Sequence, residues 1–402
     1  MKNTVPQLLK LTVFNFFIVS VLGVTMRYKI AYSFGFLDQK YLQESHSHFA
    51  FYGWITNLIY LLILRILSED FPILKTKKYV AAIIINLIGS YGMLLTFLYG
   101  GYYWLSIIFS SISLLCSFYF LFLLISDYRE IKTHARKWFL GGFFFAVLSS
   151  LGIFSLSYMM ASKDISQNIY LASTYFYLHF QYNGFFIFSC IGLFINSLEK
   201  EKIFLSQKEN NYIFWLLAIS CFVGYGLSVL WLKLPIWIFI IIVFASLMQT
   251  YGSIKFFKKV KQNWNILKEK WSSLERNILL YAGFAFFAKI LLQLISTVPA
   301  ISQFAFGFRN IVIAYLHLVL LMCISSFLFL QILKTNIFQR NKYLNFGLKL
   351  FLLGVFLNEL VLGIIGILSI KYIVFPDSQY ILLAVAILIA VSIGIIFFGI
   401  KK

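Results

Sequence analysis

Twelve long apolar segments constrain the fold of this chain more than any other feature of its sequence. Each is about 18 residues or longer, which is the length that an α-helix needs to cross roughly 30 Å of hydrocarbon. The segments lie near residues 7–26, 46–68, 79–99, 102–126, 138–161, 170–196, 211–232, 234–254, 277–297, 310–333, 344–370 and 379–399. The sequence therefore predicts an all-α, polytopic membrane protein of twelve transmembrane helices, with residues 1–402 in a single transmembrane domain.

The composition leads to the same class of protein. Of the 402 residues, 61% are hydrophobic and only 12% are charged, whereas soluble domains carry about 25% charged residues. The net charge of +20 would suit a nucleic-acid partner, but the basic residues are sorted by loop, as described next. We therefore expect the lipid bilayer, and no nucleic acid, as the partner of this chain.

Lysine and arginine are distributed unevenly between the two sides of the predicted bundle. The termini and the loops after spans two, four, six, eight and ten, together with the span ends next to them, hold 26 of the 34 basic residues. Seven lie on the opposite side, and Lys289 lies inside a span. Because basic residues concentrate on the cytoplasmic side, both termini are predicted to be cytoplasmic. The expected location is a bacterial-type inner (cytoplasmic) membrane.

Two other arrangements are not expected. Residues 1–10 lead directly into a span that is too long for a signal-peptide core and lacks a small-residue cleavage site, so the first helix should remain in the protein. The cysteines at positions 116, 190, 221 and 323 are scattered among the spans. They form neither a disulfide framework nor a covalent haem-attachment motif.

The longest cytoplasmic connection, residues 256–276, carries apolar side chains at near-helical spacing with lysines between them. These apolar residues are Trp264, Leu267, Trp271 and Leu274. The pattern favours an amphipathic helix on the inner membrane surface. A helix that docks a partner is the alternative.

Four of the five histidines fall in the outer half of predicted spans. His46 and His48 open the second span, and His179 and His317 lie about 10–14 Å below the outer ends of the sixth and tenth. An imidazole that faces lipid has no partner, so each should meet water, hydrogen-bond inside the bundle, or bind a ligand. The fifth, His134, lies in a basic inner loop and is expected to be solvated.

Because these four histidines share the outer half of the membrane, we consider the specific hypothesis that they bind a ligand. Neutral imidazole is the commonest ligand of transition metals, and two imidazoles from facing helices can hold a haem within a bundle. Hydrogen bonding without any metal is the simpler alternative for each single histidine.

Polar residues surround His179 on its own helix. Tyr175 lies four residues before His179, and Tyr182 and Asn183 lie three and four residues after it, all on the same face, with Gln181 two residues after the histidine. This stripe should face the bundle interior. It is either a second shell that orients a metal-bound imidazole or a hydrogen-bonded network that needs no metal.

Arg309 lies two helical turns outward from His317. At the rim of the bundle a guanidinium can pair with a haem propionate. Anchoring at the membrane interface is the alternative role.

Lys289 and Glu359 are the charges expected inside spans nine and eleven. Each costs about 2.5–3.5 kcal/mol at mid-membrane, so neither should face lipid. The two residues pair with each other, serve proton or ion passage, or, for Lys289, extend the ammonium to the membrane surface. We favour a structural polar contact.

The histidine placement resembles that of the haem–copper oxidase subunit I superfamily, which includes the large subunit of nitric-oxide reductase. In that family the ligands come from helices two, six, seven and ten. The family motif A-H-F-H-Y-V-L-S-M is similar to Ala314-Tyr-Leu-His-Leu-Val-Leu-Leu-Met322. The resemblance implies a low-spin b-type haem on His317 and a second-helix histidine, and copper or non-haem iron at His179.

Two departures from the family limit what the resemblance implies. Tyr315 stands where the ligand of the high-spin haem would be, and the seventh span has no histidine pair. A complete dinuclear centre is therefore not expected. The chain also resembles NnrS-type membrane proteins, which bind haem and copper, because their H-A-H-E-M-L-F-G-F is similar to His46-Ser-His-Phe-Ala-Phe-Tyr-Gly-Trp54.

His46 and His48 cannot both face one iron, because residues two apart lie about 200° apart around a helix. His48 lies deeper in the apolar run, so we expect it to be the partner of His317. His46 would then serve another metal or only the rim.

The leading hypothesis is an integral membrane b-type haem protein. Its expected work is electron transfer or the handling of nitric oxide or oxygen, with an oxidoreductase activity left open and a redox subunit or cytochrome as a possible partner. Two alternatives remain. One is a twelve-helix secondary transporter that uses Lys289, Glu359 and the stripe beside His179. The other is a non-catalytic sensor or assembly subunit.

Overall fold

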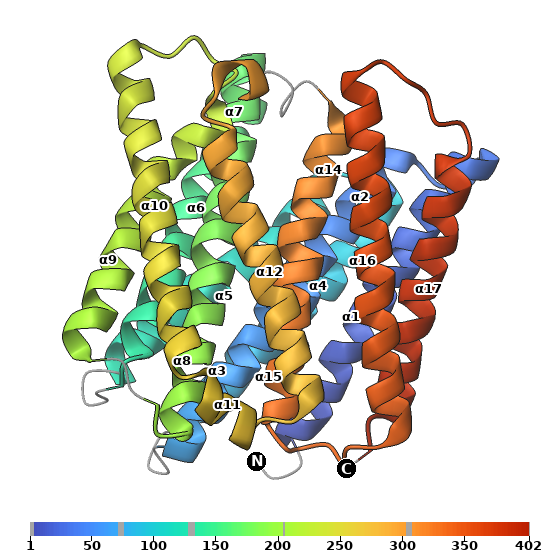
Figure 1. The fold of residues 1–402 in the computed structure, drawn as a ribbon. Helices are drawn as coiled ribbons and strands as arrows, with labels where there is room; N and C mark the ends of the chain where they lie inside the picture. The colour runs from blue at the N-terminus through green and yellow to red at the C-terminus, as the bar shows by residue number, and fades with distance from the viewer. Residues whose placement is uncertain (1–3, 71–75, 128–132, 204–205, 303–307, 402) are drawn as a thin grey trace. The chain divides into compact units, whose positions relative to one another are not determined.

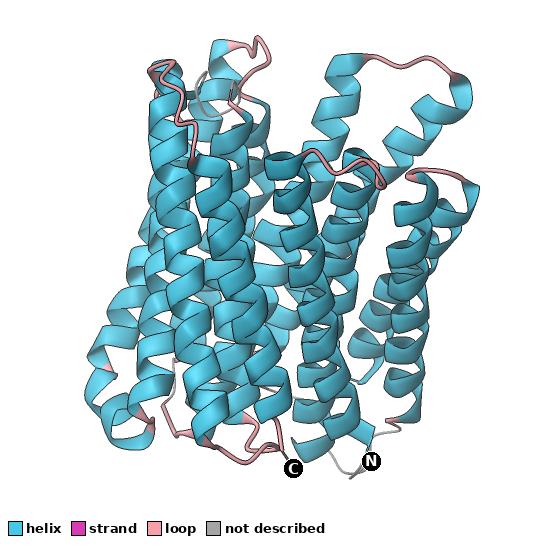
Figure 2. Ribbon diagram, turned by 90° about the vertical axis from the view of Figure 1, so that its right-hand side faces the viewer, coloured by secondary structure: helices cyan, strands magenta, loops and turns pink. Residues whose placement is uncertain are grey.

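Every named secondary-structure element in the described residues is a helix (Figure 2). The computed structural model describes residues 4–70, 76–127, 133–203, 206–302 and 308–401. Twelve helical stretches in these residues are long and apolar enough to cross a membrane. The predicted all-α polytopic membrane protein is therefore confirmed.

Helical residues extend beyond most of the predicted spans, because polar residues at their ends continue the helices. The first four spans are α1 (Thr4–Tyr32); α2 (Gln39–His48), η1 (Phe49–Thr56) and α3 (Asn57–Asp70); α4 (Lys77–Gly100); and α5 (Trp104–Asp127). The next four are α6 (Arg136–Ser162); α7 (Gln167–His179), η2 (Phe180–Phe186) and α8 (Ile187–Lys200); α9 (Gln207–Val223) with η3 (Gly224–Val229); and α10 (Ile236–Gln262). The last four are α12 (Ser273–Ile295); α14 (Arg309–His317), η4 (Leu318–Ser325) and α15 (Ser326–Lys334); α16 (Lys342–Ile370); and α17 (Ser378–Gly399).

Contacts between helices divide the chain into two compact units. Unit 1 comprises Met1–Leu123 and Ser325–Lys402, and unit 2 comprises Leu124–Ile324. In unit 1, α1 packs on α17 and on η1, and α2 packs on α4. In unit 2, α6 packs on α7, η2 and α8, and α10 packs on α9 and α12 (Figure 1). The single transmembrane domain stays a prediction.

Several helices begin where a polar side chain caps the first turn. Asp38 accepts hydrogen bonds from two backbone N–H groups at the start of α2. Ser206 with Glu209, and Ser272 with Glu275, form reciprocal capping boxes at the starts of α9 and α12. Because the first N–H groups of a helix have no partner inside the helix, these caps fix where the two spans begin.

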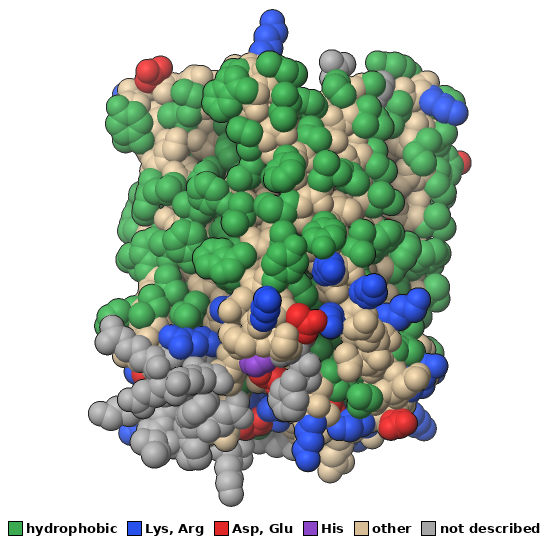
Figure 3. Space-filling model, turned by 60° about the vertical axis from the view of Figure 1, so that its left-hand side comes forward, with side chains coloured by type: hydrophobic (Ala, Val, Ile, Leu, Met, Phe, Trp, Pro, Cys, Tyr) green, Lys and Arg blue, Asp and Glu red, His purple; other side chains and the backbone are tan. Residues whose placement is uncertain are grey.

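The surface is apolar between two polar ends, as a lipid-facing protein requires. Large side chains such as Leu95, Phe244 and Phe284 are exposed on the spans. On the face drawn in Figure 3, hydrophobic side chains cover the middle and lysine and arginine gather toward one end. The two chain ends lie at the same end of unit 1 (Figure 1), where Lys10 Nζ donates to Ile400 O over 3.4 Å.

The connection between α10 and α12 differs from the predicted surface helix. α10 continues to Gln262, a short helix α11 (Trp264–Lys270) follows, and α12 begins at Ser273. Leu267 and Trp271 are buried, and Trp271 Nε1 donates to Glu201 Oε1 over 3.2 Å. The apolar surface of these two residues is therefore covered by protein, whereas the position of the segment on the membrane surface stays a prediction.

Candidate functional site

Three of the predicted histidines occupy the same structural position in their spans. His48, His179 and His317 each end an α-helix, and a π-helical segment begins at the next residue. These segments are η1, η2 and η4, of eight, seven and eight residues. π-helical turns are rare and occur frequently at functional sites.

The sequence carries a trace of this repetition that the analysis of single spans missed. His48-Phe-Ala-Phe-Tyr-Gly-Trp54 and His179-Phe-Gln-Tyr-Asn-Gly-Phe185 share the histidine, the following phenylalanine and a glycine five residues after the histidine. This shared pattern is the signal in the sequence that marks the positions of η1 and η2.

In unit 1, His48 is held with a defined ring tautomer. Its Nδ1 lies 2.8 Å from the backbone oxygen of Glu44, and since a carbonyl can only accept, Nδ1 carries the proton. The lone pair is therefore on Nε2, which lies 3.1 Å from the hydroxyl of Tyr102. The half-buried ring stacks on Phe97 of α4 at 4.3 Å.

His46 is directed to a different helix from His48. Its Nδ1 lies 3.0 Å from the backbone oxygen of Val19 in α1. Gly23, one turn further along α1, leaves space for the ring, since a Cβ there would lie 3.5 Å from His46 Cε1. The two rings of the second span thus contact different neighbours.

In unit 2, His317 repeats the arrangement of His48. Its Nδ1 lies 2.8 Å from the backbone oxygen of Ile313, four residues earlier. The proton is on Nδ1 and the lone pair on Nε2. Arg309 opens the same helix, in which every side chain is exposed or half-buried.

Tyr315 lies two residues before His317 and faces the sixth span. Its ring packs edge-on against Tyr182, with centroids 6.3 Å apart. Its hydroxyl is buried and has no hydrogen-bond partner among the described residues. The structure thus brings together two of the predicted second-shell tyrosines.

His179 differs from the other two because both of its ring nitrogens are used. Nε2 donates to the backbone oxygen of Cys221 over 2.9 Å. Nδ1 then carries the lone pair, and it accepts from Asn183 Nδ2 at 3.1 Å and from Ser228 Oγ at 3.3 Å. The ring is only 1% exposed. The predicted contact with Asn183 is thus present, whereas Cys221 and Ser228 were not anticipated.

Gln181, also part of the predicted stripe, is directed to α6, where its Nε2 donates to Ser149 Oγ over 3.0 Å. Tyr175 is half-buried. The polar residues of the sixth span therefore contact α6 through Gln181 and the ring of His179 through Asn183.

Beside His179, unit 2 contains a small cavity of about 20 Å³ that is lined by both polar and apolar side chains. Its polar lining residues come from η2 and α7, from α9, from α10 and from α12: His179, Asn183, Cys221, Gln249, Lys289 and Gln293. Gln249 and Gln293 were missed because each is a lone amide in its own apolar span. Only the packing of α10 on α12 places them together.

The two predicted intramembrane charges have different environments. Lys289 is buried in unit 2, at 2% exposure. Glu359 is half-buried in unit 1 and accepts from Asn358 Nδ2 at 3.1 Å. Their pairing stays a prediction. His134, expected to be solvated, is half-buried, and its backbone N–H donates to Glu199 Oε1 over 3.0 Å.

The ring tautomers of His48 and His317 bear on the cofactors that these residues could hold. His48 and His317 each present an Nε2 lone pair with the other nitrogen anchored, which is the usual arrangement of iron- and metal-binding imidazoles. Among the described residues there is no group of three or more His, Cys, Asp or Glu that could hold a metal ion.

Comparison of the sequence with models of protein families gives no match, and comparison with curated proteins gives no significant match. The fold itself defines the class of protein, which is an all-helical, multi-pass membrane protein.

Proposed function

We propose that this protein is an integral membrane protein that binds a b-type haem, with His48 and His317 as the axial ligands. The observation that carries the proposal is the matched state of the two rings. In both, Nδ1 donates to the carbonyl four residues earlier over 2.8 Å. The hydrogen bond fixes the tautomer and makes Nε2 the more basic atom, as a ligand to iron requires.

The surroundings of His48 supply further support. Phe97 covers one face of the ring, and Tyr102 contacts Nε2. Tyr102 is exposed at 48%, in the turn between α4 and α5. A ligand to Nε2 replaces one hydrogen bond, worth about 0.5–1.5 kcal/mol, and the phenol can turn to water.

The roles of the other predicted residues follow from their contacts. Arg309 starts the helix that ends in His317, so its guanidinium is our candidate to pair with a propionate. His46 is held against α1 and is not assigned to the iron. We do not assign copper or non-haem iron to His179, because a metal there would have to displace Asn183 and Ser228 from Nδ1.

A haem held by two imidazoles supplies one-electron transfer. We therefore propose electron transfer, or the handling of nitric oxide or oxygen, in an inner (cytoplasmic) membrane with both termini in the cytoplasm. A redox subunit or cytochrome is the expected partner. Stoichiometric haem without gas consumption would favour a sensor or assembly subunit instead.

The test is an optical spectrum of the purified protein from a haem-sufficient host. We expect a reduced-minus-oxidised haem b spectrum that His48→Ala and His317→Ala each abolish. His179→Ala, His46→Ala and His134→Ala are matched controls that should retain the haem. Each variant is first checked for a monodisperse elution profile, so that misfolded protein is not scored.

Two outcomes would refute the proposal. One is a haem-free wild-type protein from that host, which would favour a transporter. The other is a normal haem content in both His48→Ala and His317→Ala.

A further inference from the structure

The cavity beside His179 contains a cation with no counter-ion. Lys289 is 2% exposed and lines the cavity from α12. Within the described ranges its ammonium makes no hydrogen bond and no ion pair, and its nearest aromatic ring is Phe286, whose centroid lies 5.8 Å from Nζ. A buried charge is strongly unfavourable unless it is paired. The cavity is the space in which a counter-ion for the ammonium of Lys289 can bind.

The amides beside Lys289 add further donors. Gln249 Nε2 donates to Gln293 Oε1 over 3.0 Å. Since that bond uses the oxygen of Gln293, the amide N–H groups of this residue remain available to a ligand in the cavity. Both glutamines are 8% exposed and line the cavity. The lining also holds one acceptor, Asn183 Oδ1, which is buried and has no hydrogen-bond partner among the described residues. The donors that face a ligand are therefore the ammonium of Lys289 and the amide of Gln293.

No carboxylate faces the cavity from the described part of unit 2. Four glutamates of this unit lie at helix ends, where each contacts a lysine or a backbone N–H: Glu199 with His134, Glu201 with Lys270, Glu209 with Lys259 and Glu275 with Ser272. Asp164 is exposed in the loop after α6. The ring of His179 donates its Nε2 proton to the backbone oxygen of Cys221 and accepts at Nδ1 from Asn183 and Ser228. The local charge is that of Lys289 alone.

We propose that this cavity is a binding site for one small monovalent anion of the halide class, with chloride as the expected ion. Lys289 supplies the charge, and the amide N–H groups of Gln293 supply directed hydrogen bonds. The size decides the class. About 20 Å³ admits one water-sized species. A monatomic halide exceeds this size less than the polyatomic anions do, whereas phosphate or a carboxylate would have to force the helices apart. His48 and His317 do not line the cavity, so the site is independent of the haem ligands.

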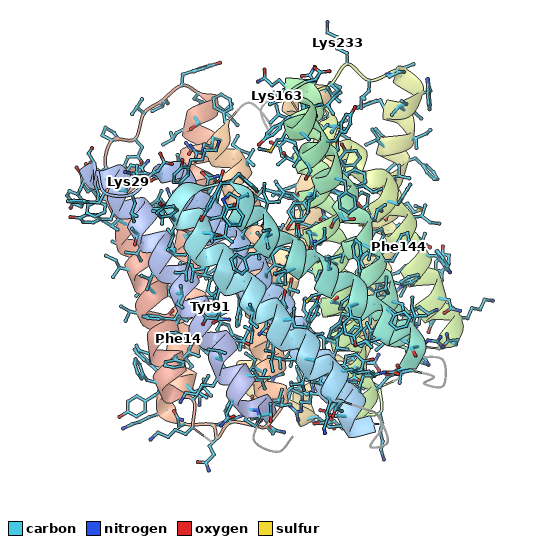
Figure 4. The ribbon with its side chains drawn as sticks, turned by 180° about the vertical axis from the view of Figure 1, so that it is seen from behind. Phe14, Lys29, Tyr91, Phe144, Lys163 and Lys233 are labelled. Atoms are coloured by element: carbon cyan, nitrogen blue, oxygen red, sulfur yellow. The ribbon has the colours of Figure 1, made fainter. Side chains whose placement is uncertain are left out.

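The direct test is equilibrium dialysis of the purified full-length protein with radiolabelled chloride. Gluconate, which is too bulky for the site, keeps the ionic strength constant as the chloride concentration is varied. The wild type should bind one chloride per chain in a saturable manner. Lys289→Gln and Lys289→Met should bind none, and Gln293→Leu should bind at least tenfold more weakly. Lys163→Gln is the matched control, because Lys163 is exposed at the loop end of unit 2 (Figure 4) and should leave binding unchanged.

Thermal unfolding gives a second readout. Replacing gluconate by chloride or bromide should raise the Tm of the wild type and of Lys163→Gln to a plateau, because a ligand that binds only the folded state stabilises it. The Lys289 variants should show no halide-dependent rise. Removing an unpaired charge from a buried site is not expected to prevent folding.

The inference is overturned by any of three results. These are no saturable chloride binding to the folded wild type, equal binding to wild type and Lys289→Met, and a halide-dependent Tm that is the same in the two proteins. The last two would mean that the cavity holds only water beside a neutral amine.

Discussion

The Nε2 atom of His179 donates a hydrogen bond of 2.9 Å to the backbone carbonyl of Cys221, and this bond ties the sixth span to the seventh. It also fixes the ring so that the lone pair on Nδ1 is taken by Asn183 and Ser228. In this state the imidazole links two helices of unit 2. Copper or non-haem iron at His179 stays a prediction.

Replacing His179 by alanine should lower stability and leave the haem in place. The substitution removes the partner of a buried carbonyl, which costs about 1–3 kcal/mol, and leaves a cavity that adds to this cost. The measurement is the free energy of unfolding in detergent micelles, alongside the haem spectrum. His134→Ala is the control, because the backbone N–H and carbonyl of His134, which alanine keeps, bond to Glu199 and Asn210. Loss of haem at unchanged stability would make His179 a ligand.

The sequence determines the twelve spans because their signal is local. Apolar length alone is enough to identify a segment that crosses the bilayer, and a spacing of four residues on one helix is enough to predict that Asn183 lies beside His179. The site depends on more than this. Gln249 and Gln293 meet only through the packing of α10 on α12.

The π-helical segments could not be predicted from propensity, since their extra carbonyls must be satisfied by other helices. In unit 1, Asn15 Nδ2 donates to Gly53 O over 2.8 Å, and Asn86 Nδ2 donates to Tyr52 O over 3.1 Å. Both asparagines are fully buried. These asparagines reach η1 only because α1 and α4 pack against it, and this packing cannot be predicted from the sequence of a single span.

Replacing Asn15 by alanine should destabilise unit 1. The asparagine donates to Gly53 O, and its Oδ1 accepts from the hydroxyl of Tyr91 at 2.6 Å (Figure 4 labels Tyr91). Its removal orphans both groups, so we expect a loss of about 1–3 kcal/mol. Asn168→Ala, at an exposed site, should change stability by less than about 0.5 kcal/mol. Equal unfolding free energies for the two variants would contradict the account of η1.

Gly152 should not tolerate alanine, because α6 meets α7 there through backbone atoms. A Cβ at this position would lie 2.5 Å from Ser173 O and 2.9 Å from Tyr177 N, and backbone atoms cannot move aside without separating the helices. Overpacking of this kind costs about 1–3 kcal/mol or more.

The matched control is Gly283→Ala in α12, where the nearest side-chain atom, Phe257 Cε1, would be at an ordinary 3.7 Å. Alanine favours a helix over glycine by about 1 kcal/mol, so this variant should be as stable as the wild type or more so. Thermal unfolding of the two variants in one detergent provides the comparison. A Gly152→Ala protein as stable as Gly283→Ala would show that α6 and α7 are further apart.

The side of the membrane reached by each end of unit 2 can be read by cysteine labelling. The native thiols are buried and unpaired, so they should give a low background with a membrane-impermeant maleimide. Lys163 and Lys233 are exposed at one end of unit 2 (Figure 4), and Lys208 is exposed at the start of α9, one span away from Lys233. The excess of basic residues on the side of Lys208 predicts that this side is cytoplasmic.

In intact spheroplasts, Lys163→Cys and Lys233→Cys should therefore react with the maleimide, whereas Lys208→Cys should react only after the membrane is permeabilised. The wild-type chain, with its four buried thiols, is the blank for both conditions. Labelling of Lys208→Cys in sealed spheroplasts, with Lys163→Cys protected, would place the termini outside. The outer-half depth assigned to His48 and His317 would then become an inner-half depth, and the expected redox partner would lie in the cytoplasm.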